Sequence, residues 1–139
     1  LDAMSFHIPE LEETIEAKHR PVIIISSNAA KELPDAFLRR CVFHYIEFPD
    51  PEQMEDIVRV HFPDIDSQLM EAAILRFYAL RGVRGLRKNT STSELIDWLF
   101  VLIRGGIPAE SLAAAVPYLG TLLKQEGDVA LAKSAQSWS

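Results

Sequence analysis

The chain has 139 residues, 48% hydrophobic and 24% charged, which is enough for one domain with a buried core. Its net charge of −6 argues against broad binding to nucleic acid, and no apolar stretch approaches the ~20 residues of a membrane-spanning helix. The one cysteine, Cys41, excludes an intrachain disulfide and fits a reducing cytoplasm. We expect Cys41 itself to be a small buried residue. The chain begins at Leu1 rather than at methionine, which is typical of a processed product or a fragment.

The first 49 residues have the pattern of an α/β segment. An acidic connection, in which 6–9 form either an edge strand or a loop, leads to Val22–Ile25. This continuous β-branched run is typical of a strand buried on both faces. Pro34–Arg40 predicts a short helix, because proline is tolerated in a first turn, and Val42–Phe48 predicts a second strand. Two strands rarely form a stable sheet alone, so this segment indicates the end of a larger sheet.

The remainder has the apolar spacing and the caps of a helical bundle. Helices are expected over 51–61 after Asp50, from Asp66 to about Arg81, and over 92–104, where Ser91 and Glu94 form a capping box. One or two further helices should follow Pro108, and Trp98 should lie in the core. The expected fold is therefore an α+β fragment that is mostly α, with an α/β part over 1–49 and a helical domain over 50–139.

Polar and basic side chains stand where the predicted strands and helices end. Asn28 follows the first strand, and ligand sites of open α/β sheets lie at the carboxyl ends of the strands. Arg39 and Arg40 end the short helix and carry fixed charge in a geometry that matches phosphate. This order is typical of one half of a nucleotide site. The chain contains neither a G-x-x-x-x-G-K-[ST] phosphate loop nor a magnesium-binding acidic pair after an apolar strand.

Two phrases, SSNAAKELPDAFLRRCVFHYIEFPDPE and LRKNTSTSELIDW, resemble the MoxR-like branch of the AAA+ ATPases and cover about a third of the chain. The resemblance implies the last two strands of the family's αβα core, followed by its complete helical lid. The phosphate loop and the magnesium-binding acids would then lie upstream of Leu1. The intact protein is expected to be an ATPase that uses ATP and Mg²⁺, whereas this chain alone is expected to bind neither and to be inactive.

The same resemblance assigns roles to individual residues. Asn28 matches the sensor-1 position, where an amide holds the attacking water. Arg40 matches the arginine finger that acts on a neighbouring subunit's nucleotide, with Arg39 as the alternative. Arg87 is the candidate for the lid cation called sensor 2, and Lys88 is its alternative. The first turn of the third helix lacks the arginine that the family's pattern would place there. Structural readings stay open, in which the arginines satisfy a helix end and the basic loop is merely solvated.

The resemblance further implies a ring, typically a hexamer, that works as a chaperone-like machine in the cytoplasm. Its clients would include proteins with von Willebrand factor A domains, and no membrane partner is implied. Two alternatives remain at this point. The chain could be a free-standing helical interaction module that never meets ATP. It could also belong to a clamp-loader-like replication ATPase, which the run Leu38–Cys41 suggests, although the net charge of −6 counts against that reading. The histidines share no metal-binding spacing, so no metal site is expected within this chain.

Overall fold

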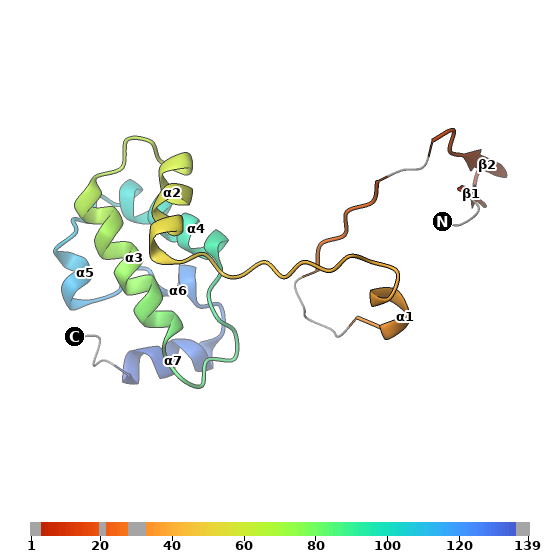
Figure 1. Ribbon diagram of the computed structural model, residues 1–139. Coiled ribbons are helices and arrows are strands. Elements are labelled where there is room, and N and C mark those ends of the chain that lie inside the picture. Colours follow the sequence, from red (N-terminus) through yellow and green to blue (C-terminus); the bar gives the residue numbers. More distant parts are fainter. Residues whose placement is uncertain (1–3, 20–21, 28–32, 136–139) are drawn as a thin grey trace. The chain divides into compact units, whose positions relative to one another are not determined.

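The computed structural model describes residues 4–19, 22–27 and 33–135, and it shows a small, mostly helical α+β protein (Figure 1). The chain divides into two compact units, Leu1–Tyr45 and Ile46–Ser139. Residues 46–49 belong with the helices because the ring of Phe48 stacks on Phe77, with ring centroids 6.2 Å apart.

The second unit, here called the helical unit, is built on three capped helices at the positions the sequence predicts. They are α2 (Pro51–His61), α3 (Ser67–Arg81) and α4 (Thr92–Arg104). The Asp50 side chain accepts a hydrogen bond from the backbone of Gln53 at 2.9 Å, and Asp66 caps α3 through Leu69 at 2.8 Å. Each cap satisfies one of the N–H groups that a helix leaves unpaired at its start. The predicted helices are confirmed.

Three short helices complete the part of the helical unit that the structure describes, where the sequence predicted one or two. They are α5 (Ser111–Ala114), α6 (Leu119–Leu122) and α7 (Glu126–Ser134). The break between α5 and α6 falls around Pro117, which cannot donate a helical hydrogen bond and disfavours helix in the residue before it. Tyr118, which precedes α6, then adopts a left-handed backbone conformation with φ +54°.

The core of the helical unit is apolar and fully enclosed. Its largest members, all with no exposed surface, are Trp98, Phe77, Met54, Met70, Leu80, Leu95, Leu99, Leu102 and Leu112. The expected burial of Trp98 is confirmed, and its Nε1–H donates to the carbonyl of Pro117 at 2.6 Å. A buried indole N–H needs such a partner, so Trp98 both fills the core and fixes the turn before α6.

Among its described residues, 4–19, 22–27 and 33–45, the first unit contains a β-hairpin and one short helix. Strands β1 (Ser5–Ile8) and β2 (Glu13–Glu16) pair antiparallel, with Phe6 opposite Ile15. The sequence allowed a strand at 6–9 but placed no partner beside it. Helix α1 (Asp35–Leu38) lies within the predicted range and is shorter than predicted.

The two predicted strands, the first of which was expected to be buried on both faces, are wrong for this chain. Residues 22–27 and 41–49 belong to no sheet and contain neither strand nor helix. Val22 is 91% exposed and Val42 is fully exposed. A strand needs a neighbour for its backbone hydrogen bonds, and no described residue pairs with either run. The apolar side chains of these runs therefore stay exposed, because no sheet forms to bury them.

Candidate functional site

The basic loop, residues 82–90, joins α3 to α4 and carries the candidate nucleotide-contacting cations. It turns at Gly85, whose φ of +92° is a left-handed conformation that glycine adopts without strain. The backbone N–H of Arg87 donates to Oδ1 of Asp128 on α7 at 3.0 Å, and Asp128 is only 3% exposed. The Arg87 side chain is exposed. The loop is thus anchored through its backbone while the guanidinium faces solvent.

Lys88 is held at the first turn of α4. Its Nζ forms an ion pair with Oε1 of Glu94 at 3.0 Å. Glu94 also accepts hydrogen bonds from the backbone N–H of Ser91, at 2.6 Å, and from the Ser91 hydroxyl. Burial alone would raise the pKa of Glu94, but the hydrogen bonds from Ser91 and Lys88 outweigh it and hold the pKa below its ordinary value. The ammonium group therefore lies beside a helix N-terminus, a position that attracts anions.

Arg81, at the C-terminal end of α3, is a residue that sequence reasoning missed. Its guanidinium carbon lies 3.5 Å from the ring centroid of Phe48, and its Nη1 donates to the carbonyl oxygen of Thr90. Burial lowers the pKa of the Arg81 guanidinium, and the nearby Tyr78 oxygen partly offsets this decrease. The spacing of Phe77 and Arg81, four residues apart on one helix, is the signal that could have indicated an aromatic contact.

The arginine pair lies in the first unit, directly after α1. Both residues are exposed, and Nη1 of Arg40 donates to the carbonyl of Ala36 at 2.7 Å. That contact satisfies a helix C-terminus, as the structural reading of the pair predicts. Asn28 lies outside the described residues. Arg87 and Lys88 lie together in the basic loop, in the other unit.

The other candidate features carry no reactive site. The expected burial of Cys41 is wrong, because its neighbours from 41 to 48 form extended, exposed chain. Among the residues that the structure describes, no three histidine, cysteine or acidic side chains are grouped to hold a metal ion. Within 4–19, 22–27 and 33–135, no helix combines the length and apolarity needed to cross a bilayer.

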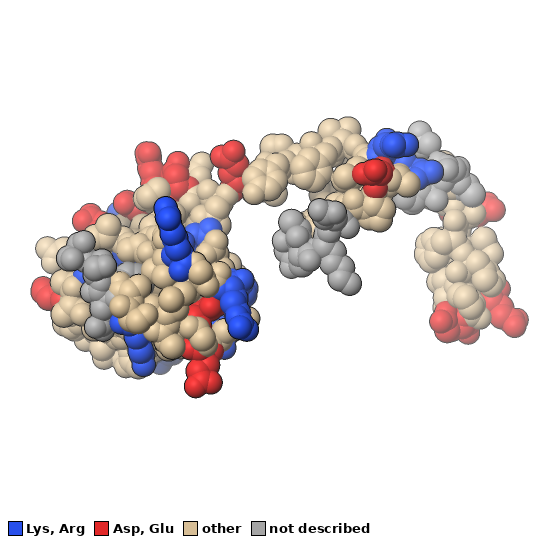
Figure 2. All heavy atoms as spheres, turned by 90° about the horizontal axis from the view of Figure 1, so that it is seen from below, with Lys and Arg blue, Asp and Glu red and all other residues tan. Residues whose placement is uncertain are grey.

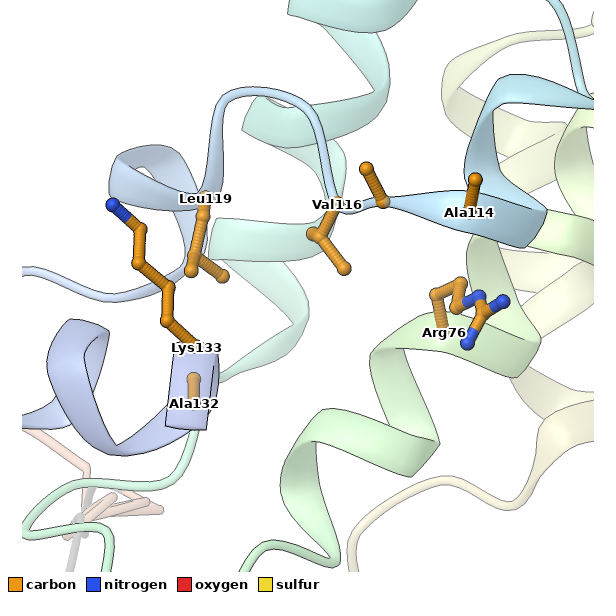
Figure 3. A pocket seen from close by; sticks show the side chains of 7 residues that line it. Arg76, Ala114, Val116, Leu119, Ala132 and Lys133 are labelled. Carbon is orange, nitrogen blue, oxygen red and sulfur yellow. The ribbon is translucent and has the colours of Figure 1, made fainter. Parts of the chain in front are cut away.

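A pocket of about 180 Å³ lies among α3, α5, α6 and α7 (Figure 3). Figure 3 shows Arg76 on one side of it and Ala132 and Lys133 on the other, with apolar side chains between. The Arg76 Nε–H donates to the carbonyl of Leu112 at 2.6 Å, and Nη2 donates to that of Ala113. The guanidinium thus holds α5 against α3, and the remaining lining offers mainly apolar contact.

Charges of both signs are interspersed on the face of the helical unit seen in Figure 2. That face therefore presents no broad basic field of the kind that tracks a nucleic-acid backbone. Comparison of the chain with the models of known protein families, with curated proteins and with solved structures finds no match.

Proposed function

We propose that this chain is the sensor and lid part of a MoxR-like AAA+ ATPase, a chaperone-like protein-remodelling machine. The observation that carries the proposal is the contrast between closed helices and exposed strand-like runs. Val22 belongs to a run with the composition of a buried strand and Val42 to a run with the composition of a strand, yet both residues are exposed. The helical unit that follows is capped and closed. A sheet completed elsewhere in the protein would bury the runs and leave the helical unit as a separate lid.

The basic loop supports a contact with phosphate. Among the described residues, the Arg87 guanidinium has no hydrogen-bond or ion-pair partner, whereas Lys88 is paired with Glu94. The planar fork of an exposed guanidinium can donate to two phosphate oxygens at once, which a paired ammonium cannot. Arg87 is accordingly the first candidate for the lid cation. Lys88 would serve to fix the loop at the first turn of α4, and Asn28 would hold the attacking water.

Arg40 would act on the nucleotide of a neighbouring subunit in a ring, and Arg39 is the alternative. Both are exposed, and the Arg40 bond to Ala36 uses only one of its five N–H donors. Mg²⁺ and the phosphate loop would be supplied by residues that this chain does not contain. ATP when bound supplies the phosphoryl group that is transferred to water. The remodelling role, a hexameric ring, clients with von Willebrand factor A domains and a cytoplasmic location follow from the same resemblance and are part of the proposal.

The test is ATP hydrolysis by the full-length protein whose sequence includes this chain. Purified protein should hydrolyse ATP in the presence of Mg²⁺, and Arg87→Ala should lower the rate more than Lys88→Ala does. Calorimetry of the 139-residue chain alone should show no tight binding of ATP with Mg²⁺, because the phosphate loop supplies most phosphate contacts. A full-length protein that neither binds nor hydrolyses ATP would overturn the proposal.

A free-standing interaction module is the second candidate. The helical unit exposes several large apolar side chains, including Val60, at 80%, and Leu75, at 71%. Such side chains would serve a protein contact where they join into one contiguous apolar patch. This candidate would gain support if the full-length protein lacked ATPase activity while Leu75→Glu abolished a partner interaction and left the fold intact.

A further inference from the structure

The segment that enters the helical unit is held by side chains of α3. The hydroxyl of Tyr78 donates to the carbonyl oxygen of Pro49 at 2.5 Å. The guanidinium of Arg81 stacks over the ring of Phe48, at 3.5 Å from the centroid, and the Phe48 ring also meets Tyr78 edge-on at 6.2 Å. Burial raises the pKa of the Tyr78 hydroxyl, which Arg81 partly offsets and Asp50 reinforces, so the hydroxyl stays protonated as a donor.

Arg81 continues this path to the basic loop. The same guanidinium that covers Phe48 donates to the carbonyl of Thr90, the residue before the α4 cap. Ser91 follows, with its N–H and hydroxyl on Glu94, and Glu94 pairs with Lys88. Thr90 is buried, with 2% of its surface exposed. Displacement of Phe48 would therefore change the position of Lys88, first through the Arg81 guanidinium and then through the capping box of Ser91 and Glu94.

We infer that Arg81 is a positioning residue that couples the segment at Phe48 to the basic loop. The coupling itself rests on the contacts above, and its effect on ATP turnover rests on the proposed function. The planar guanidinium is suited to the task because it can present a face to a ring and an edge N–H to a carbonyl at once. Lysine offers a point charge and cannot keep both contacts in this geometry.

A simpler role for Arg81 would be to place a positive charge at a helix C-terminus and cover an aromatic ring. Arg104 does this at the end of α4, with its guanidinium 5.2 Å from the ring centroid of Phe100. Phe100 and Arg104 belong to the same helix, so this pair bridges no second segment. Arg104→Lys is thus the matched control for Arg81→Lys.

The first experiment measures amide hydrogen exchange and the Glu94 carboxyl pKa by NMR in the 139-residue chain. Arg81→Lys should speed exchange at Ser91 by roughly 10-fold, as expected for local loss of a capping contact, while the middle of α4 keeps its protection. The Glu94 pKa should move up toward its ordinary value. Phe48→Leu should cause the same changes, because its ring meets Arg81 and the aromatic rings of α3. Arg104→Lys should leave Ser91 and Glu94 unchanged.

Two results would overturn the inference. The first is an effect of Arg81→Lys at Ser91 without any effect of Phe48→Leu, which would make Arg81 a local support only. The second is an equal effect of Arg104→Lys. If Arg81→Lys loses protection throughout α4, the chain is globally destabilised, and Phe48→Leu at a partly exposed position then decides.

The second experiment uses the full-length protein. Arg81→Lys and Phe48→Leu should each lower kcat by roughly 10-fold and change KM for ATP less than twofold, as a misplaced lid cation would. If the full-length protein has no ATPase activity, the proposed function is overturned, and the NMR experiment alone then tests the coupling through Arg81. An active ATPase with unchanged kcat in both variants would overturn the coupling's role in turnover alone.

Discussion

The helical unit and the first unit handle similar apolar side chains in opposite ways. In the helical unit, Trp98 and Phe77 have no exposed surface, whereas Val22 and Val42 before it are almost entirely exposed. A helix satisfies its own backbone hydrogen bonds, so each capped helix can form and then bury one face. A strand needs an adjacent strand to pair its backbone N–H and C=O groups. The difference teaches that local signals are enough for the helices, whereas a strand-like run forms a strand only where a neighbouring strand pairs with it.

The largest expected effect tests the functional side of that comparison. In the full-length protein, Arg40→Ala should lower ATP turnover by ~10³-fold or more, the range of arginine fingers, while nucleotide affinity changes far less. Arg40→Lys should also fail, because a point charge lacks the planar fork. Steady-state hydrolysis and nucleotide titration measure the two quantities.

Mixed rings provide the control for Arg40. Rings should recover part of the hydrolysis when subunits with Arg40→Ala are mixed with subunits that carry a damaged phosphate loop. Some interfaces in such rings contain both an intact phosphate loop and an intact Arg40. Normal hydrolysis by Arg40→Ala would move the role to Arg39. Lost hydrolysis without recovery in mixed rings would point to a structural role within one subunit.

The next effect concerns the enclosed core. Trp98→Ala should lower the free energy of unfolding of the helical unit by about 3–5 kcal/mol, the usual cost of truncating a buried aromatic residue. The substitution also leaves the Pro117 carbonyl without its donor. Phe100→Ala on the same helix, at a side chain that is 51% exposed, should cost much less. Urea unfolding followed by circular dichroism compares the two, and equal losses would contradict the described core.

A smaller loss is expected at the α3–α5 contact. Arg76→Ala removes the donors to the carbonyls of Leu112 and Ala113 and should cost about 0.5–1.5 kcal/mol, the net contribution of a typical hydrogen bond, because water can replace the donor at the exposed Ala113. Arg104→Ala is the control at an exposed arginine over Phe100. If both variants unfold at the same urea concentration as the parent chain, the guanidinium does not hold α5.

The smallest effect is a dependence on pH. The pKa of Glu94 is lower in the folded state than in the unfolded state. The hydrogen bonds and the ion pair of Glu94 therefore stabilise the fold at pH values above the pKa that this carboxyl has in the unfolded chain. This contribution should be lost as the pH falls below about 4.3, the ordinary pKa of glutamate. Glu94→Gln should show a shallower loss of stability than the parent over that range. Parallel pH profiles of the two proteins would exclude a contribution from Glu94.

Much of the helical unit could be predicted from the sequence because its signals are local. Asp50, Asp66 and the Ser91–Glu94 box each place a helix start by chemistry within one turn. The predicted ranges and the burial of Trp98 follow from these caps and from apolar spacing.

The errors have non-local causes. Whether Val22–Ile25 forms a strand depends on neighbouring strands. The hairpin of β1 and β2 depends on a pairing register, which the acidic composition of this segment does not indicate. At the candidate site, Arg87 and Lys88 could be placed on one loop from sequence alone. The contact of Arg81 with Phe48 joins residues 33 positions apart, so no short-range pattern specifies it.

The most direct test is amide hydrogen exchange at residues 22–27 and 42–46, measured in the 139-residue chain and again in the full-length protein. In the chain we expect these amides to exchange freely while α2, α3 and α4 are protected. In the full-length protein we expect the same runs to become protected, because a completed sheet would pair their backbone. Exchange that stays fast in the full-length protein, or that is slower in these runs than in the helices of the chain alone, would contradict their assignment as strands of a larger ATPase core.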